Sequence, residues 1–474
     1  MIYVHWMVYV IYVIVTIAAI IAVLTDNRQP AKAVAWIMAL IFLPVIGIVL
    51  YFFFGQNTRK EKFLSKHNID LLTESAMLEF VEQKNLTVPD NHKSLITLFA
   101  NRSMALPFKD NTTDIYTDGY QYFHALMQGI GQARHHIHID TYIFDDDPLG
   151  FLIADMLIDK AKEGVEVRII YDDVGCWNVK NSFFARMEDA GIEVYPFMPV
   201  RFPAFTSKVN YRNHRKLCVI DGRTAFIGGM NIALRYIKGT GTQPWRDTHL
   251  RIRGNAVYGV QRAFLVDWCF VSGTLITHRR YYPEMKDATR NNCLMQVVTD
   301  SPMSRWPDIM QGYVRILLEA RRYVYMETPY FLPTEPILYA MRIAALAGID
   351  VRIMIPMHAD ARFVEWASRS YMSEVVESGV KVYFYKAGFN HSKLLISDDA
   401  LVSCGSANVD FRSFDNNFEA NVFIYDEETA MRFKNIFMDD LKESVPIEDV
   451  SRHISIPFLQ RLWESVVRLL SPLL

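Results

Sequence analysis

The sequence predicts two similar α/β lobes packed about a pseudo-two-fold axis and preceded by a helical hairpin in a membrane. Three observations lead to this fold class. Two long apolar stretches stand near the start of the chain. The remainder repeats one series of strand-like and helix-like segments in the same order. Each repeat also carries one copy of a short polar motif, NHRKLCVID at 213–221 and NHSKLLISD at 390–398.

The apolar stretches, Tyr3–Leu24 and Ala33–Phe54, contain no Lys, Arg, Asp or Glu. At about 1.5 Å per residue, each gives about 33 Å of helix, which is enough to cross the hydrocarbon core of a bilayer. A short connector joins them, so residues 1–58 are predicted to form a two-helix transmembrane hairpin. Pro44 and Gly47 are expected to kink the second helix. A cleaved signal peptide fits the first stretch less well, because a second apolar stretch follows at once.

Charge and cysteine usage bound the location and the partners. Basic residues are denser after the hairpin than in its connector, which places the large domain in the cytoplasm under the positive-inside rule. The formal net charge of −2 gives no global basic field that would gather nucleic acid. The five cysteines are scattered and form no CxxC pair, which favours buried, reduced thiols in a reducing compartment.

The repeat is visible segment by segment. ARHHIHIDTYIF at 133–144 resembles ARRYVYMETPYF at 320–331, and AKEGVEVRIIYDD at 161–173 resembles ALAGIDVRIMIPM at 345–357. Strand-like runs alternate with helical stretches that begin near an acidic residue, which predicts an α/β fold with a largely parallel sheet. A repeat of this length is far too long for a solenoid. The predicted bounds are 59–110 for a linker region, 111–290 for the first lobe, 291–450 for the second lobe and 451–474 for a C-terminal amphipathic helix.

The polar motifs supply groups suited to phosphate chemistry. Side chains two apart on a strand share a face, so His214 lies beside Lys216 and His391 beside Lys393. Two ammonium groups can balance the charge of a phosphate and of its transition state. One imidazole can then attack phosphorus while the other protonates the leaving alcohol. We therefore predict that the two lobes meet at one catalytic site.

The aspartates that end the motifs, Asp221 and Asp398, complete the predicted catalytic set. Their parity is opposite to that of the histidines and each begins a turn, so we expect them to brace the site from the turn. The return strands carry Asn231, Ser406 and Asn408, which can donate hydrogen bonds to a phosphate.

A histidine nucleophile needs a carboxylate that fixes its tautomer. Asp247 and Glu419 occupy matching places after the two motifs, and each is expected to orient the histidine of its own half. A metal site is the rival interpretation of paired His and carboxylates. It is disfavoured because a lysine two residues from each histidine is a poor neighbour for a cation.

At this point the residues resemble the phospholipase D superfamily, whose signature is His-x-Lys-x4-Asp twice over, and more closely the bacterial cardiolipin synthases. The resemblance covers nearly the whole chain, including RNHRKLCVIDG, PWRDTHLRIRG and GSANVDFRSFDNNFEANVFIYD. It implies that the predicted α/β lobes are two phospholipase D-like lobes. One departure is Gly229, which stands where the second half has Ser406.

The resemblance implies a transfer that needs no metal and no cofactor. One phosphatidylglycerol gives its phosphatidyl group to a histidine and releases glycerol, and a second phosphatidylglycerol then attacks and yields cardiolipin. On the family pattern His214 is the nucleophile and His391 is the general acid and then base. The implied partners are phosphatidylglycerol, cardiolipin and the lipid bilayer, with no nucleic acid, and a homo-oligomer stays open. The implied location is the bacterial cytoplasmic membrane, crossed more than once.

Two other functions remain alternatives. Hydrolysis by the same chemistry would make the protein a membrane-bound phospholipase D, whereas the hairpin argues against a nuclease. A non-catalytic membrane scaffold is disfavoured because the polar site residues are present in both halves. Two further segments have open roles. The basic stretch at 201–216 fits a membrane-facing lip or a solvated loop, and the helical pattern at 456–474 fits the membrane interface, which we favour, or a dock on the core.

Overall fold

The structure is a computed structural model. It describes residues 2–26, 30–43, 45–51, 55, 88–102, 105–200, 210–241, 243–285, 291, 293–304, 306–451, 458–469 and 471. Pro44, most of the predicted linker region and the part of the basic stretch at 201–209 lie outside the described residues. The chain divides into two compact units, Met1–Phe63 with Val200–Tyr211 and Leu64–Pro199 with Arg212–Leu474.

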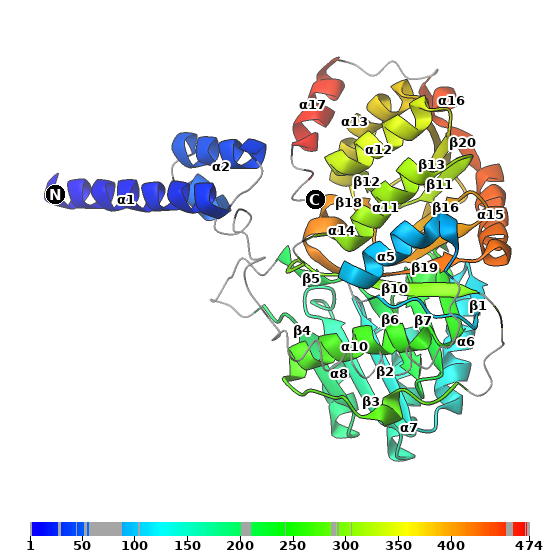
Figure 1. The fold of residues 1–474 in the computed structure, drawn as a ribbon. Helices are drawn as coiled ribbons and strands as arrows, with labels where there is room; N and C mark the ends of the chain where they lie inside the picture. Colours follow the sequence, from blue (N-terminus) through cyan, green and yellow to red (C-terminus); the bar gives the residue numbers. More distant parts are fainter. Residues whose placement is uncertain are drawn as a thin grey trace. The chain divides into compact units, whose positions relative to one another are not determined.

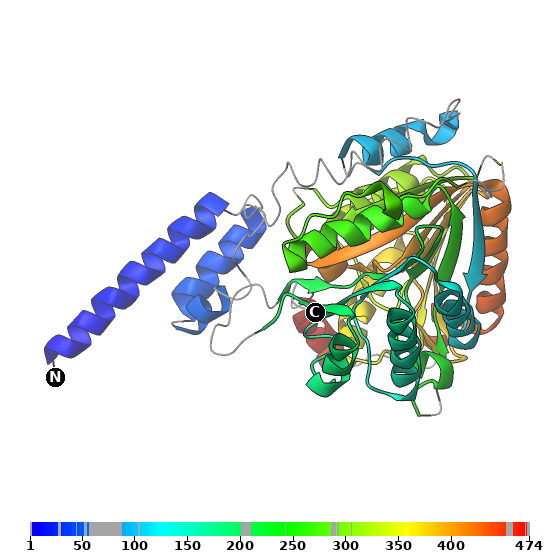
Figure 2. The same cartoon turned by 90° about the horizontal axis from the view of Figure 1, so that it is seen from below.

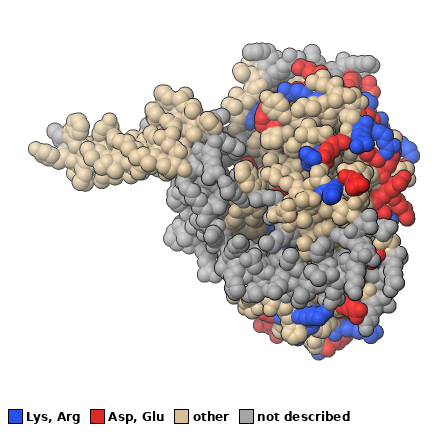
Figure 3. Space-filling view, viewed as in Figure 1, with Lys and Arg blue, Asp and Glu red and all other residues tan. Residues whose placement is uncertain are grey.

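The smaller unit is helical where it is described, with α1 at Ile2–Asp26, α2 at Pro30–Phe42 and α3 at Ile46–Leu50. Among the described residues, α1 alone is long and apolar enough to cross a membrane, with a mean hydropathy of 2.8. The face of α1 seen in Figure 3 shows no charged side chain. Within the described residues the second apolar stretch is interrupted where a kink was expected, because α2 ends at Phe42, Val45 has a φ of 66° and α3 begins at Ile46; the second span stays a prediction. The proline at position 44 cannot donate the hydrogen bond that would continue the helix.

The first lobe of the larger unit is a seven-stranded sheet in the order β1-β9-β7-β6-β2-β3-β4. Its strands are β1 (Asn111–Tyr116), β2 (His136–Thr141), β3 (Glu166–Asp172), β4 (Glu193–Phe197), β6 (Lys216–Ile220), β7 (Thr224–Gly228) and β9 (His249–Gly254). Its helical elements are α6 (Gly119–Gln132), α7 (Pro148–Lys162), α8 (Asn181–Asp189), α9 (Arg235–Lys238), α10 (Val257–Ser272) and η5 (Arg279–Tyr281). The preceding η3 (Asp90–His92) and α5 (Lys93–Arg102) pack instead on the core of the second lobe.

The second lobe repeats this sheet and adds one edge strand, in the order β10-β19-β17-β16-β11-β13-β14-β20. Its strands are β10 (Leu294–Asp300), β11 (Tyr323–Glu327), β13 (Asp350–Pro356), β14 (Lys381–Tyr385), β16 (Leu394–Ser397), β17 (Leu401–Gly405), β19 (Asn417–Tyr425) and β20 (Ser444–Pro446). The helices are α11 (Asp308–Glu319), α12 (Glu335–Leu346), α13 (Arg362–Glu377), α14 (Phe411–Asp415), α15 (Glu427–Lys442), α16 (Ile447–Ser451) and α17 (Phe458–Arg468). A short pair of strands, β12 (Phe331–Leu332) and β18 (Val409–Asp410), lies beside the sheet.

The sheet orders confirm the predicted duplication, because β1 corresponds to β10, β9 to β19 and so on across seven strands. Figures 1 and 2 show the two sheets of the larger unit with helices packed along them. The expectation of a largely parallel sheet is wrong. In the main sheet of each lobe two neighbouring strand pairs are parallel, and the other pairs within that lobe are antiparallel. The polar motif and its return strand form a tight hairpin, which forces antiparallel pairing on that half of the sheet.

Aspartates cap the starts of α6, α7, α14 and α15, as expected for helices that begin near an acidic or polar residue. The carboxylate of Asp147 accepts hydrogen bonds from Leu149 and Gly150 at the start of α7, which also has a proline in its first turn. Asp426 caps α15 in the same manner. Such caps satisfy backbone donors that have no partner inside the helix.

The C-terminal helix α17 packs on α13. Val467 is buried, the rings of Trp463 and Trp366 meet edge to face, and Arg468 lies 2.9 Å from Glu374. The dock on the core, which was the less favoured of the two interpretations, is therefore present. The apolar side chains of Leu459, Leu462, Val466 and Leu469 stay exposed on the same helix, so its role at the membrane interface remains a prediction.

Candidate active site

One pocket of about 300 Å³ is lined by residues of both lobes. Four of the predicted site residues line it: His214, Asn231, His391 and Asn408. The two histidine motifs, 177 positions apart in sequence, thus face a single cavity, as predicted.

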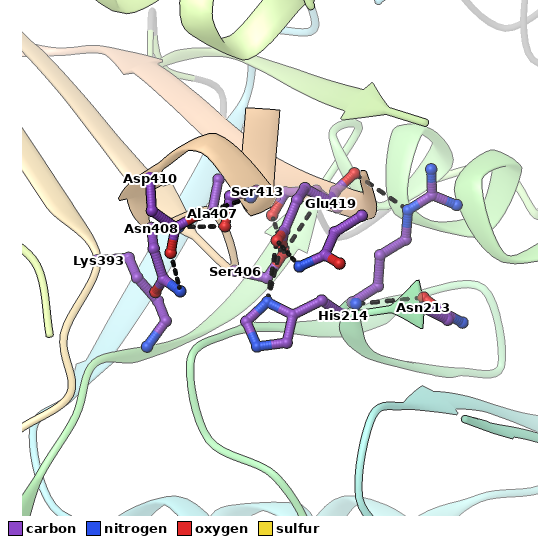
Figure 4. A network of polar contacts seen from close by, with 12 residues as sticks. Asn213, His214, Lys393, Ser406, Ala407, Asn408, Asp410, Ser413 and Glu419 are labelled. Atoms are coloured by element: carbon purple, nitrogen blue, oxygen red, sulfur yellow. Dashed lines mark hydrogen bonds and ion pairs between the residues drawn. The ribbon is translucent and has the colours of Figure 1, made fainter. Parts of the chain in front are cut away.

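Two very short parallel strand pairs join the lobes at this pocket. In the first, β5 (Arg212–Asn213) pairs with β19, and the backbone N–H of His214 donates to the carbonyl of Phe418 at 2.9 Å. His214 and Glu419, which directly follow the paired residues, therefore lie side by side. The Nδ1 atom of His214 lies 3.0 and 3.1 Å from the two carboxylate oxygens of Glu419. Figure 4 shows this contact within the polar network around it.

The second joint repeats the first with the lobes exchanged. β8 (Trp245–Arg246) pairs with β15 (Phe389–Asn390), and the N–H of His391 donates to the carbonyl of Arg246 at 2.6 Å. The Nδ1 atom of His391 then lies 2.7 Å from Asp247 Oδ2.

The expectation that each carboxylate holds the histidine of its own half is wrong. Glu419 of the second lobe pairs with His214 of the first, and Asp247 of the first lobe pairs with His391 of the second. The crossing follows from the strand pairs, because parallel pairing places residues that follow two strands of different lobes next to each other. Both carboxylate side chains are fully buried.

Burial and charge together set the protonation of these pairs. Burial lowers the pKa of His214 to about 4, and the opposing effect of Glu419 is smaller. Burial and then Lys393 lower the pKa of His391 to about 3. Burial alone would raise the pKa of Asp247, but Lys393 and His391 hold it below its usual value, and His214 acts likewise on Glu419. Near neutral pH each pair is a neutral imidazole with its Nδ1–H on a carboxylate, which leaves Nε2 as a base or nucleophile.

The two motif lysines lie against their histidines. Lys216 Nζ donates to the carbonyl of His214 at 2.5 Å, and burial lowers the pKa of this lysine to about 7. Lys393 Nζ lies 2.9 Å from Nδ1 of His391 and also donates to the carbonyl of that residue. Two ammonium groups and two carboxylates therefore share one buried centre, which makes it nearly neutral before a substrate enters.

Comparisons with known proteins identify the family of the chain. The family model described as "Cardiolipin synthase, PLD-like domain" matches residues 126–240 and 313–441, and the model described as "Phospholipase_D-nuclease N-terminal" matches residues 14–56. Cardiolipin synthase 2 of Bacillus anthracis is 42% identical over 458 residues, covering 95% of this chain and 88% of the relative. The major cardiolipin synthase ClsA of Bacillus subtilis (strain 168) is 39% identical, covering 95% of each chain. The chain belongs to the cardiolipin synthase family.

Membership of this family makes the protein a phosphatidyltransferase of the phospholipase D type. The fold agrees, because phosphatidylserine synthase of Haemophilus influenzae Rd KW20 superposes with a TM-score of 0.60. That match has 12% sequence identity and covers 80% of this chain and 100% of the other, so it shows the fold alone.

The motif aspartates of this cardiolipin synthase fold, Asp221 and Asp398, support the strands next to the site. Asp221 accepts hydrogen bonds from the backbone of residues 134–136, and Asp398 accepts from residues 321–323. Each has a φ of 54°, in the turn after its motif strand. They brace the start of β2 and β11, as expected, and they do not line the pocket, so their place among the catalytic residues stays a prediction.

The predicted phosphate donors are mostly occupied by neighbouring protein groups. Ser406 Oγ donates to Glu419 at 2.5 Å and steadies that carboxylate. Asn231 donates to the Tyr236 hydroxyl at 2.8 Å, and Asn408 donates to Asp410 at 3.1 Å. Their role at phosphate stays a prediction.

The departure at Gly229 has a steric reason. A Cβ atom at this position would collide with the carboxylate of Asp247. The first lobe therefore has no room for the serine that supports Glu419 in the second lobe, and its shorter acid, Asp247, fills that space.

The asparagine before each histidine shapes its loop, a role that the sequence reasoning missed. Asn213 accepts from the N–H of Arg215 at 3.2 Å and donates to Asp140 at 2.5 Å. Asn390 makes the matching pair of bonds, to the N–H of Ser392 and to the carboxyl of Glu327. The signal was present, because both motifs read Asn-His-x-Lys.

Two buried arginines have a role that the sequence reasoning did not give them. Arg215 was assigned to a membrane-facing lip or a solvated loop, which is wrong because its side chain is buried, and Arg246 was given no role. Arg215 donates to the carbonyls of Glu419 and Asp300 and pairs with Asp267 of α10. Arg246 donates to Ser392 and Thr248 and pairs with Asp440 of α15 at 2.6 Å. One arginine thus stands next to each histidine–carboxylate pair and ties the two lobes together. Nothing in the motif spacing predicts these contacts, because the partners lie on distant helices.

The crossed pairs predict which residues are energetically coupled. Double-mutant cycles should give about 0.5–3 kcal/mol of coupling for His214→Ala with Glu419→Gln and for His391→Ala with Asp247→Asn, as for residues in direct contact. The own-half cycles, His214 with Asp247 and His391 with Glu419, are the matched controls and should give clearly less. Unfolding of the detergent-solubilised protein measures both. Larger coupling within each half would contradict the crossed arrangement.

The lowered pKa values predict the pH dependence of turnover. The nucleophile must be neutral, so activity should persist as pH falls below 6.5 and drop only near the pKa of His214, about 4. Lys216 is charged below its pKa of about 7 and loses its charge as pH rises through that value, so turnover should fall on the alkaline side of neutrality. Initial rates across pH 3.5–9.5 on vesicles of fixed composition test this. An acid limb at the ordinary histidine pKa of about 6.5 would contradict it.

Proposed function

We propose that the protein joins two phosphatidylglycerol molecules into cardiolipin and releases glycerol, through a phosphatidyl group held on His214. The observation that carries this proposal is the pair of crossed histidine–carboxylate contacts at one pocket. Each contact fixes one Nδ1–H, so two Nε2 atoms are available to act in turn on one phosphorus atom. A site with a single histidine could not both hold the phosphatidyl group and manage the proton of the alcohol.

In the first step Nε2 of His214 attacks the phosphorus of the donor lipid. The bond from phosphorus to the glycerol oxygen breaks, and His391 gives a proton to that oxygen. Glu419 stabilises the charge that develops on His214, as the carboxylate does in other histidine-dependent triads. The ammonium groups of Lys216 and Lys393 balance the charge on the phosphate oxygens. An anionic phosphate in the pocket would itself favour protonated His391, which acts against the low pKa set by burial.

In the second step the hydroxyl of another phosphatidylglycerol replaces the departed glycerol. His391 now takes the proton from this hydroxyl, the oxygen attacks phosphorus, and the bond from phosphorus to His214 breaks. The groups described at the pocket suffice for both steps, so no metal ion is part of the proposal. Water in place of the second lipid would give hydrolysis, the activity of a phospholipase D.

The protein is proposed to work in the bacterial cytoplasmic membrane with its catalytic lobes in the cytoplasm. The apolar helix α1 and the excess of basic residues after the first 58 support this orientation. We propose that the apolar segment carrying α2 and α3 also enters the membrane, so that the chain crosses it twice. The exposed apolar side chains of α17 suit the interface of the same bilayer.

Purified protein in phosphatidylglycerol vesicles should form cardiolipin and glycerol in equal amounts, with and without EDTA. His214→Ala and His391→Ala should each abolish turnover, because the two histidines act as one unit. Thin-layer chromatography and a glycerol assay measure the products. Phosphatidic acid as the main product would favour hydrolysis, and near-half activity in either variant would mean two independent sites. A loss in EDTA that magnesium restores would refute metal independence.

A covalent intermediate should accumulate when only the second histidine is disabled. In His391→Ala, a phosphatidyl p-nitrophenyl ester labelled on phosphorus still has a leaving group that needs no proton. The label should be acid-labile and base-stable and should map to the peptide that contains His214. Glu374→Gln, a carboxylate change on α13 outside the pocket lining, serves as the matched control for folding. Label on His391 of the wild type would reverse the assignment, and no label on either histidine would refute the covalent route.

A further inference from the structure

Two arginines that take no part in the proposed chemistry line the pocket. Arg235 and Arg412 are repeat mates, since each stands four residues after the pocket asparagine of its own lobe, Asn231 and Asn408. Duplication has thus placed one guanidinium in each lobe at corresponding positions of the pocket wall.

Each arginine shares the pocket wall with an aromatic ring that contacts one of the two histidines. Arg235 stacks over Trp245 at 5.9 Å, and the Trp245 ring lies 5.5 Å from that of His391. Arg412 lines the same pocket as Tyr142, whose ring lies 5.2 Å from that of His214. Burial and then Asp172 raise the pKa of Tyr142, and the charge of Arg412 opposes them.

Both guanidinium groups can accept an anionic ligand. Arg412 makes no ion pair with a carboxylate in the described part of the chain. A guanidinium nitrogen of Arg235 lies 3.5 Å from a carboxylate oxygen of Asp145, and both side chains are more than a third exposed. Ion pairs as exposed as this one contribute little to stability. Arg212, which also lines the pocket, differs because it is buried and pairs with the buried carboxylate of Asp172.

Joining two phosphatidylglycerol molecules brings two phosphodiesters into one pocket. The reacting one is served by the motif lysines. The other belongs to the acceptor lipid, stays intact and is separated from the attacking hydroxyl by a three-carbon glycerol. Its negative charge repels the reacting phosphate at this short range unless a cation lies beside it. Arginine is suited to that task because its planar fork binds two phosphate oxygens at once.

We propose that Arg235 and Arg412 form a subsite for the intact phosphodiester of the acceptor lipid. The proposal rests on the proposed function and concerns its second step, in which the P–N bond to His214 breaks, a P–O bond forms and the hydroxyl proton passes to His391. No bond of the intact phosphodiester changes. The subsite therefore selects the alcohol, favouring an anionic lipid over a neutral alcohol or water.

A competition between two acceptors tests the subsite. Dioleoylphosphatidyl-p-nitrophenol in phosphatidylcholine vesicles is the donor, and equal amounts of phosphatidylglycerol and monooleoylglycerol are the acceptors. The two acceptors share the vicinal diol, and only one carries a phosphate. Released p-nitrophenolate reports the first step, and mass spectrometry gives the ratio of cardiolipin to the monooleoylglycerol adduct.

Arg235→Gln with Arg412→Gln should lower this ratio at least tenfold, and each single variant should lower it less. Arg369→Gln on α13 removes a positive charge that pairs with Glu365 outside the pocket lining, so its ratio should stay within twofold of the wild type. That control separates the subsite from a general loss of attraction to anionic vesicles. An unchanged ratio in the double variant would overturn the subsite.

A second measurement needs no variant. In the wild type, soluble glycerophosphoglycerol should suppress transfer to phosphatidylglycerol at least tenfold more strongly than free glycerol does, and equal suppression would contradict the subsite. If the double variant releases p-nitrophenolate and selects its acceptor normally, the subsite is refuted and the proposed function is not. A wild-type protein that releases no p-nitrophenolate removes the proposed function and the subsite with it.

Discussion

The site depends on two parallel strand pairs that are only two residues long. β5 with β19 and β8 with β15 join the lobes, and the residue that follows each strand is a histidine or its carboxylate. The backbone hydrogen bonds of these pairs set the distance between Nδ1 and the carboxylate, so small relative movements of the lobes act directly on the imidazoles. The Asx-type bonds of Asn213 and Asn390 and the guanidinium groups of Arg215 and Arg246 hold the same joints. Fold and chemistry therefore share one set of contacts.

Burial gives the joined site its electrostatic character. Removal from water disfavours charge on histidine and lysine, and it would also disfavour charge on the carboxylates if the opposite charges were absent. Because two lysines and two carboxylates are buried together, the carboxylates stay ionised while the imidazoles stay neutral. The protein groups alone thus keep the nucleophile unprotonated. A phosphodiester that enters brings a net negative charge to a centre that was close to balance.

The sequence predicted the duplicated fold and the meeting of the two motif histidines at one pocket. Both predictions rest on internal repeats and on the alternation of side chains along strands, which can be recognised without knowing the tertiary structure. The sequence did not predict that Asp247 and Glu419 each contact the histidine of the other lobe. That pairing depends on the register of the backbone between the lobes, which cannot be deduced from the spacing of side chains in the sequence. The placement of Ser406 and the tightness at Gly229 also depend on that register. The break after α2 was expected only as a kink, because a proline reveals a missing donor and not the extent of the interruption.

The two junctions look alike in backbone, but the arginine that donates hydrogen bonds across each of them comes from the first lobe. At one junction the guanidinium belongs to Arg215, which faces the Phe418 ring, and at the other it belongs to Arg246, which faces Ser392. A molecule made of two first lobes would bring two guanidinium groups together at each junction, and one made of two second lobes would have none there. The halves have consequently become complementary and can no longer replace each other. The two lobes of this one chain therefore relate to each other as the two different subunits of a heterodimer do.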